Sequence, residues 1–254
     1  MVKRDYKIIK LVSENLKKLA IGGTAVGTGL NSSDDFGKKV AKELSSKLDC
    51  EFESDDNKFY ELASKSALVN SHASLKALAS DLYKIANDIR FLSSGPRCGI
   101  GEIIIPANEP GSSIMPGKVN PTQVESMTMI TIQVMANDFA ITMANSQGQL
   151  QLNTYMPLII YNMDQSITLL AKSLKCFREN LLVGLKANKS KIKENLDNSL
   201  MLVTSLSPHI GYDKASKLAK YAYDNNLTLR DANKDLGYLS DEDFDKYVRA
   251  ENMV

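Results

Sequence analysis

The chain has 254 residues, of which 43% are hydrophobic and 24% charged, an ordinary composition for a globular protein of one large domain or two small ones. Its 31 basic side chains offset 30 acidic ones, so the charge gives no reason to expect binding to nucleic acid or to an anionic membrane. The N-terminus lacks the apolar run of a signal peptide, and no stretch of about 18 apolar residues indicates a membrane span. The three cysteines fit neither a disulfide framework nor a zinc site, and they are Cys50, Cys98 and Cys176. We therefore expect a soluble, cytoplasmic protein.

Apolar residues follow a helical period along most of the chain. They recur every three or four positions at Ile9, Val12, Leu16 and Leu19, then at Leu68, Leu75, Leu78, Leu82, Ile85 and Ile89, and later at Met163, Ile167, Leu170, Leu174, Phe177 and Leu181. Between Val124 and Ile141 they are denser and lie on more than one face, which indicates a helix with neighbours on several sides. The pattern predicts long helices over 60–90, 122–145 and 155–182. Only the run 102–106 alternates in the manner of a strand.

The long helices end near Asn188, and the shorter elements beyond it predict a second domain. Gly237 is suited to ending a helix, and Ser240 with Asp243 resembles a capping box. We therefore expect an all-α protein, with a central helical-bundle domain over 1–187 and a small helical C-terminal domain over 188–254. Apolar stripes of this length form a core in the first instance, and any that stay uncovered favour oligomerisation.

Residues 109–121 cannot form the interior of a helix, because they hold three prolines and two glycines. They lie directly before an apolar helix. Thr122 and Glu125 have the spacing of a capping box, so we expect the helix to begin there. Its N-terminus would present unpaired N–H groups and a positive dipole end to a carboxylate. Taken alone, Glu125 is more readily a capping residue than a catalytic acid.

Polar side chains in this segment could add to such a site. Lys118 provides a mobile cation, Asn120 provides amide donors, and Ser112 and Ser113 provide hydroxyls beside glycines that allow close approach of a ligand. By residue types alone, a binding loop and an ordinary surface loop remain equally consistent with the segment.

Residues 111–121, GSSIMPGKVNP, resemble without mismatch the signature of the fumarase/aspartase superfamily. Further blocks of the same family resemble residues 22–31, 86–92 and 94–97, and the resemblance runs from about residue 6 onward. Residues 22–31 are glycine-rich, but they lack the ending and the preceding strand of a phosphate-binding loop. Residues 208–215 and 236–239 resemble the C-terminal domain of class II fumarate hydratases more than that of aspartases.

The resemblance implies a lyase of the tricarboxylic acid cycle. The reaction it implies is the reversible hydration of fumarate to L-malate, without metal or organic cofactor. It also implies a homotetramer with each active site built from three subunits. By position, Ser112 resembles the catalytic serine that acts as a base, and Glu125 resembles a glutamate that partners a catalytic histidine. The substrate-binding residues implied are Ser113, Lys118, Val119 and Asn120.

Family members carry further chain ahead of the region that matches Arg4, including a Thr-His pair that acts as the second acid/base. His72 and His209 do not match that pair and are more readily structural. The resemblance therefore predicts a truncated chain that needs a complementing N-terminal half for activity. Two alternatives are an inactive remnant or interaction module that can join a tetramer, and an aspartate ammonia-lyase fragment.

Overall fold

The computed structural model describes residues 1–95 and 97–253, and the chain folds into two compact units. Unit 1 comprises Met1–Ile100 and Ile105–Leu185, and unit 2 comprises Gly101–Ile104 and Lys186–Val254. Among the described residues, none of the helices combines the length and the apolar character that crossing a membrane requires.

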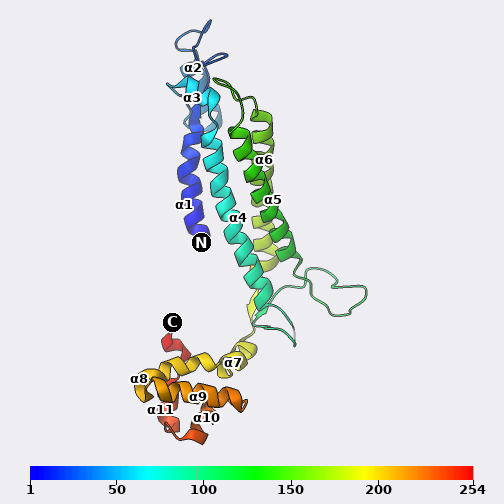
Figure 1. Ribbon diagram of the computed structural model, residues 1–254. Helices are drawn as coiled ribbons and strands as arrows, with labels where there is room; N and C mark the ends of the chain where they lie inside the picture. The colour runs from blue at the N-terminus through cyan, green and yellow to red at the C-terminus, as the bar shows by residue number, and fades with distance from the viewer. Residues whose placement is uncertain (96, 254) are drawn as a thin grey trace. The chain divides into compact units, whose positions relative to one another are not determined.

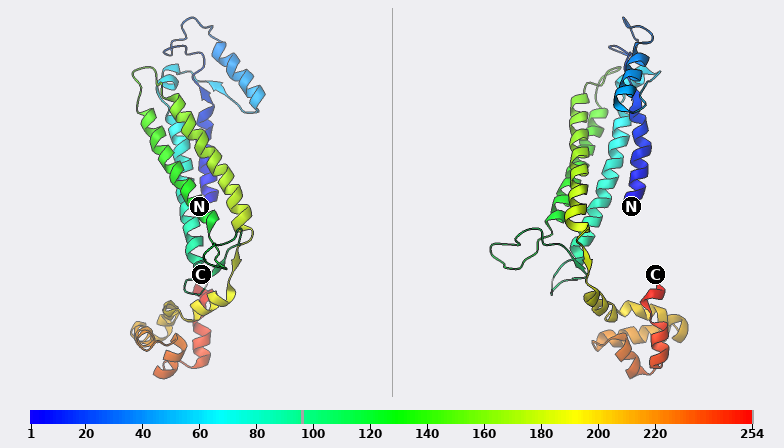
Figure 2. Two further views of the ribbon diagram at one scale, coloured as in Figure 1. Left: turned by 90° about the vertical axis from the view of Figure 1, so that its right-hand side faces the viewer. Right: turned by 180° about the vertical axis from the view of Figure 1, so that it is seen from behind.

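The elements of unit 1 in chain order are α1 (Val2–Ser13), η1 (Glu14–Lys17), β1 (Lys18–Leu19), α2 (Phe36–Leu48), β2 (Glu53–Ser54), α3 (Lys58–Ala63), α4 (Ser66–Leu92), α5 (Thr122–Asn145), α6 (Met156–Phe177) and η2 (Arg178–Leu182). The long bundle of this unit consists of α1, α4, α5 and α6, which lie side by side (Figure 1 and Figure 2). The all-α fold class is thereby confirmed.

The predicted apolar stripes of α4 and α6 face each other and α5 in the core of unit 1. Leu78, Leu82, Leu170 and Phe177 are buried in one cluster with residues of α5. Ile167 is the exception, because it is 49% exposed. The core face of α6 passes through the neighbouring Ser166 instead, which is fully buried against polar partners described below.

The predicted helix boundaries hold at the C-terminal ends and fail at one start. The stretch 60–90 is two helices rather than one, because α3 ends at Ala63 and α4 begins at Ser66. Asn57 caps α3, and its side chain accepts a hydrogen bond from the Tyr60 backbone N–H at 3.1 Å. The stretch 155–182 is α6 continued by the single π-turn η2.

The strands are two residues long and tie distant segments together. β1 pairs in parallel with β2 through Lys18 opposite Glu53. β3 (Ile103–Ile104) lies inside the run 102–106 and pairs antiparallel with β4 (Lys186–Ala187).

Unit 2 is a small helical unit with its own apolar core. Its remaining elements are α7 (Lys189–Asp197), η3 (Leu200–Leu206), α8 (Ser207–Ile210), α9 (Tyr212–Asp224), α10 (Leu229–Leu236), α11 (Asp241–Tyr247) and η4 (Ala250–Met253). Leu206, Leu218 and Phe244 are buried at its centre. Gly237 ends α10 in the left-handed conformation, and the Ser240 side chain caps α11 by accepting from the Asp243 N–H at 3.1 Å, as predicted.

Candidate functional site

The loop of residues 111–121 is closed on itself just before α5 begins. The Asn120 side-chain amide donates a hydrogen bond to the Gly111 carbonyl. Gly111 lies so close to the Lys118 carbonyl that a Cβ atom at this position would overlap it. Gly117 has a φ of 78°, which a side chain disfavours, so both glycines are needed to form the loop.

Ser112 lies half-buried in this loop, with its side-chain oxygen surrounded by backbone donors. The hydroxyl oxygen accepts hydrogen bonds from the N–H of Ile114 at 3.1 Å and from the N–H of Met115 at 3.3 Å. Two fixed N–H dipoles directed at one oxygen stabilise negative charge on that oxygen. These two N–H groups would stabilise negative charge that develops on the Ser112 oxygen.

The other predicted binding residues of the loop face solvent in the isolated chain. Ser113 and Lys118 are exposed, and Val119 is 45% exposed. Lys118 forms no ion pair with any residue that the structure describes. The apolar tip is more exposed still, since 91% of Ile114 is open to solvent. The loop thus presents a free cation, hydroxyls and an apolar tip on one exposed segment.

Helix α5 begins at Thr122 as predicted, but the predicted capping box is wrong. The N-cap is Pro121, and no side chain caps the helix, because Thr122 is already its first residue. The Glu125 side chain is half-buried, and its nearest cation is the Arg90 guanidinium, with Nη2 3.9 Å from Oε1. Its carboxylate is therefore free of any capping role.

The glycine-rich residues 22–31 form a turn beside a cavity of about 300 Å³. Lys38 of α2 and Lys58 of α3 line this cavity together with Asp34 and Asp56, so cations and carboxylates are balanced in number there. Gly23 allows the Lys58 stem to pass directly over the turn, because a Cβ atom on this glycine would lie 2.9 Å from the Lys58 Cβ.

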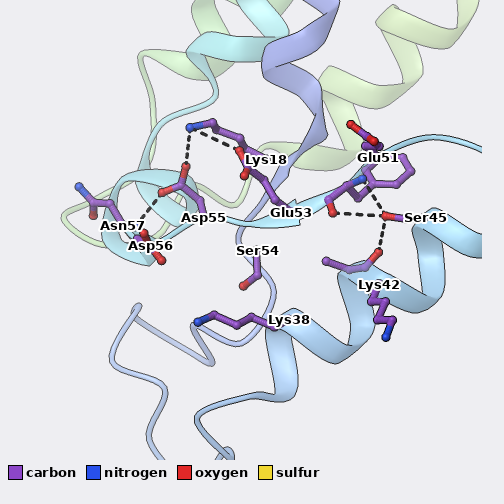
Figure 3. Close-up of a pocket in the computed structure, with 12 residues that line it drawn as sticks. Lys18, Lys38, Lys42, Ser45, Glu51, Glu53, Ser54, Asp55, Asp56 and Asn57 are labelled. Atoms are coloured by element: carbon purple, nitrogen blue, oxygen red, sulfur yellow. Dashed lines mark hydrogen bonds and ion pairs between the residues drawn. The ribbon is translucent and has the colours of Figure 1, made fainter.

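An adjoining cavity of about 670 Å³, which no sequence pattern predicted, lies between α2 and the segment that contains β2 (Figure 3). Lys18 lies 3.6 Å from both Glu53 and Asp55 on its acidic side, while Lys38 and Lys42 of α2 form the basic side. No motif marks this cavity, because its groups come from three separate elements.

The glycine-rich turn and the loop of residues 111–121 lie at opposite ends of α4 (Figure 1). This helix has 27 residues, which at 1.5 Å per residue separates its ends by about 40 Å. The match over 86–92 falls in the last turns of α4 near the loop, and that over 94–97 includes Pro96, which lies outside the described residues. The glycine-rich turn and the loop of residues 111–121 therefore cannot meet within one copy of the chain.

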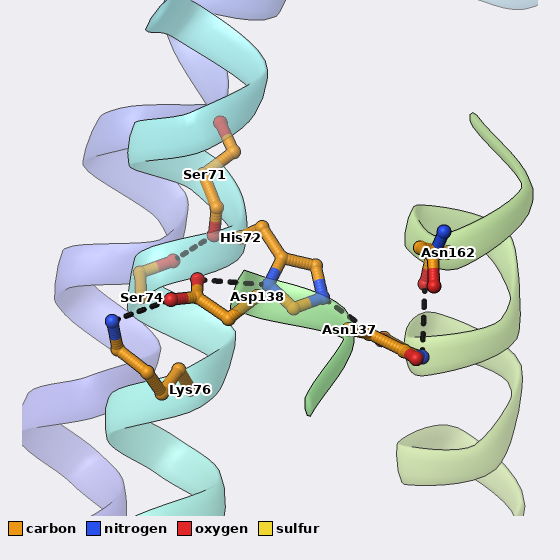
Figure 4. A network of polar contacts seen from close by, with 8 residues as sticks. Ser71, His72, Ser74, Lys76, Asn137, Asp138 and Asn162 are labelled. Atoms are coloured by element: carbon orange, nitrogen blue, oxygen red, sulfur yellow. Dashed lines mark hydrogen bonds and ion pairs between the residues drawn. The ribbon is translucent and has the colours of Figure 1, made fainter. Parts of the chain in front are cut away.

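A buried polar network joins α4, α5 and α6 around His72 (Figure 4). The Nδ1 atom of His72 lies 3.0 Å from Asp138, its Nε2 atom lies 2.8 Å from the Ser166 hydroxyl, and the Asn137 amide donates to that hydroxyl at 3.0 Å. Because Ser166 already accepts from Asn137, its own proton points to Nε2, which leaves the imidazole neutral with its proton on Nδ1. Lys76 pairs with the second Asp138 oxygen at 2.5 Å.

This Asp-His-Ser arrangement has the connectivity of a hydrolase triad but not its accessibility. His72 and Ser166 are both fully buried, and neither lines a described cavity. Burial lowers the pKa of His72 below its ordinary value of 6.5, and hydrogen bonding to Asp138 opposes this effect only in part. The network is therefore structural, as predicted for His72. His209 lies in unit 2, where its ring stacks on Tyr247.

Comparison with known protein families gives two matches along the chain. A family model described as a lyase matches residues 1–136, and one described as the fumarase C C-terminus matches residues 202–254.

Individual relatives agree with these family matches. The class II fumarate hydratases of Oceanobacillus iheyensis and Bacillus subtilis are 54% and 52% identical over all 254 residues, and the chain covers 55% of each. The crystal structure of the class II fumarase from Schistosoma mansoni has a TM-score of 0.93 and 42% identity, covering 97% of this chain and 55% of that one. A fumarate lyase:delta crystallin structure from Brucella melitensis has a TM-score of 0.91 and 37% identity, covering 97% and 53%. The chain thus spans about half the length of the curated relatives it matches.

Proposed function

Because the chain belongs to the lyase family, with class II fumarate hydratases among its relatives, we propose that it takes part in the reversible hydration of fumarate to L-malate. The observation that carries this proposal is the environment of the Ser112 oxygen. Removing the C3 proton of malate requires a base, and a serine oxygen can act as one only where its negative charge is stabilised. The N–H groups of Ile114 and Met115 provide that stabilisation.

The remaining loop residues are suited to hold a dicarboxylate. The intermediate carries extra negative charge on the carboxylate beside the reacting carbon, so a cation and fixed donors lower its energy most. Lys118 is an unpaired cation on the loop. The same loop contains Ser113 before it and Val119 and Asn120 directly after it. Closing the loop through Asn120 and Gly111 holds these groups together before substrate arrives.

Glu125 would assist catalysis through an acid/base partner. No described residue of this chain lies close enough to Glu125 to be that partner. The carboxylate lies in the first turn of α5 without a capping bond, and the one cation beside it is Arg90. His72 cannot serve as its acid/base partner, because Asp138 and Ser166 engage both ring nitrogens. We propose that a histidine from another chain or segment completes the pair.

We further propose that the working site forms between copies of the chain. The glycine-rich turn and the loop are separated by the length of α4, so one site can use both only if different subunits contribute them. Helix α5 presents an uncovered apolar stripe with helical spacing, formed by Met129, Ile132, Ala136, Phe139 and Met143. Such a stripe on a long helix is typical of a helix that packs against a second copy.

The experiment is steady-state fumarate hydration by the 254-residue chain, alone and mixed with the remaining half of a full-length relative. We expect little activity from the chain alone and measurable activity from the mixture. Ser112→Ala should lower kcat of the mixture by about 10²–10⁴-fold, the usual contribution of one acid/base group, while KM changes little. Lys118→Met should impair both kcat and KM, because a cation beside the carboxylate stabilises substrate and transition state.

Ser126→Ala is the matched control, because Ser126 is an exposed serine of α5 that makes no side-chain hydrogen bond within the described residues. It should retain the activity of the unmodified mixture. Full activity of Ser112→Ala would refute the base assignment. A mixture without activity, despite assembly into oligomers, would favour the alternative of an inactive interaction module.

A further inference from the structure

Unit 2 contains a cavity whose lining is rich in hydrogen-bond donors. Its volume is about 460 Å³, and η3, α8, α11 and η4 provide its lining residues, which are Thr204, Ser205, His209, Lys246, Tyr247, Asn252 and Met253. The described lining holds no carboxylate, whereas both cavities beside the glycine-rich turn are lined by aspartates. Among the described lining residues, the fixed charge is that of the Lys246 ammonium.

Two basic side chains of this cavity, Lys246 and His209, lie against one tyrosine ring. The His209 and Tyr247 rings stack with centroids 3.6 Å apart and planes 12° from parallel. Tyr247 itself packs against the apolar core of unit 2, so the stack fixes the imidazole at the cavity wall. The Lys246 ammonium lies 5.5 Å from the centre of the same tyrosine ring and forms no ion pair with a described residue.

Neutral side chains of the lining can also donate hydrogen bonds. The Thr204 hydroxyl and the Asn252 amide make no side-chain hydrogen bond within the described residues. Ser205 differs, because its hydroxyl donates to the Leu202 carbonyl at 2.9 Å. An ammonium, an imidazole, a hydroxyl and an amide that line one cavity without a described carboxylate can donate to the oxygens of an anion.

We propose that this cavity binds a small oxyanion, with Lys246 as its charged ligand and His209, Thr204 and Asn252 as further hydrogen-bond donors. Phosphate and carboxylate groups share the required chemistry. The inference is independent of the function proposed for residues 111–121, because every residue that carries it belongs to unit 2.

The test uses NMR of the whole chain with histidine labelled at the Cε1 carbon. The chain has two histidines, so the buried His72 is an internal reference for His209. Inorganic phosphate, added at pH 7 and constant ionic strength, should shift the His209 signal saturably and leave the His72 signal in place. Lys246→Gln should weaken this binding by about tenfold, which corresponds to about 1.4 kcal/mol. Lys217→Gln, which changes an exposed lysine of α9 outside the lining, should leave it unchanged.

Parallel titrations with L-malate and with sodium chloride distinguish the ligand classes. Saturation with phosphate alone would assign a phosphate site, and saturation with L-malate alone would assign a carboxylate site. A shift that chloride reproduces, or an equal affinity in Lys246→Gln, would overturn the proposal.

Discussion

His72 combines full burial with a fixed protonation state. Its neutral ring donates from Nδ1 to Asp138 and accepts at Nε2 from Ser166. A second proton, on Nε2, would remove the acceptor of the Ser166 hydroxyl and so disrupt the network. Burial lowers its pKa below 6.5, and an unfolded histidine has no such shift. As the pH falls below about 6.5, His72 therefore binds a proton in the unfolded chain but not in the folded chain.

We predict that the free energy of unfolding decreases as the pH is lowered from about 6.5 to the lowered pKa of folded His72. A single group contributes a slope of at most about 1.4 kcal/mol per pH unit. His72→Gln should remove this contribution, and it should lower stability at pH 7 by about 1–3 kcal/mol because buried partners lose a hydrogen bond. Urea unfolding at several pH values measures both effects.

His209→Gln is the matched control for that measurement, since His209 is exposed in unit 2. Comparing its slope with that of His72→Gln separates the effect of the buried network from the loss of an imidazole elsewhere in the chain. An unchanged slope in His72→Gln would contradict the interpretation of His72 as a neutral, buried base.

The same network explains where the sequence pattern failed at single residues. Apolar spacing assigned Ile167 to the core of α6, but the core position belongs to Ser166, because His72 needs a hydroxyl there. A polar residue at a buried position is invisible to a hydrophobic period. Only the contact across three helices, 94 positions apart for His72 and Ser166, reveals it.

At the scale of elements, the long helices were predictable because each repeats one apolar face over several turns. The start of α5 was also predictable, but its cap was not: Pro121 occupies the N-cap, and Thr122 is one residue too late to cap. The shape of the loop before it was hidden as well, since Gly111 approaches Lys118 through backbone atoms that carry no sequence signal. The role of each loop residue remains a prediction.

Gly111→Ala tests the closed form of this loop. The added methyl group would overlap the Lys118 carbonyl, so we expect the loop to open and the activity of the complemented enzyme to fall at least about tenfold. The melting temperature should change little, because the loop lies outside the core. Gly117→Ala is the comparison: nothing lies within 4 Å of its added carbon, so only its φ of 78° opposes the change. A larger loss in Gly117→Ala would contradict the steric explanation.

At the scale of the whole molecule, the apolar residues of α5 divide into two stripes with different roles. One stripe, which includes Met127, Val134 and Ile141, is buried within the chain. The stripes of α4 and α6, which the sequence predicted to form a core in the first instance, close the same core. The uncovered face is the second stripe of α5, with 70% of Phe139 and 56% of Ile132 exposed. Self-association is therefore expected to run through α5.

Phe139→Asp tests this expectation directly. Burying a phenylalanine against a second copy contributes about 2 kcal/mol per chain, and an aspartate there would add an unpaired charge to the interface. We expect sedimentation velocity at micromolar concentration to show an oligomer for the unmodified chain and smaller species for Phe139→Asp, with unchanged helical circular dichroism. Tyr212→Asp replaces an equally exposed aromatic residue of unit 2, and it should leave the oligomer intact. A monomeric unmodified chain would contradict the role of the α5 stripe, as would dissociation by Tyr212→Asp to the same extent as by Phe139→Asp.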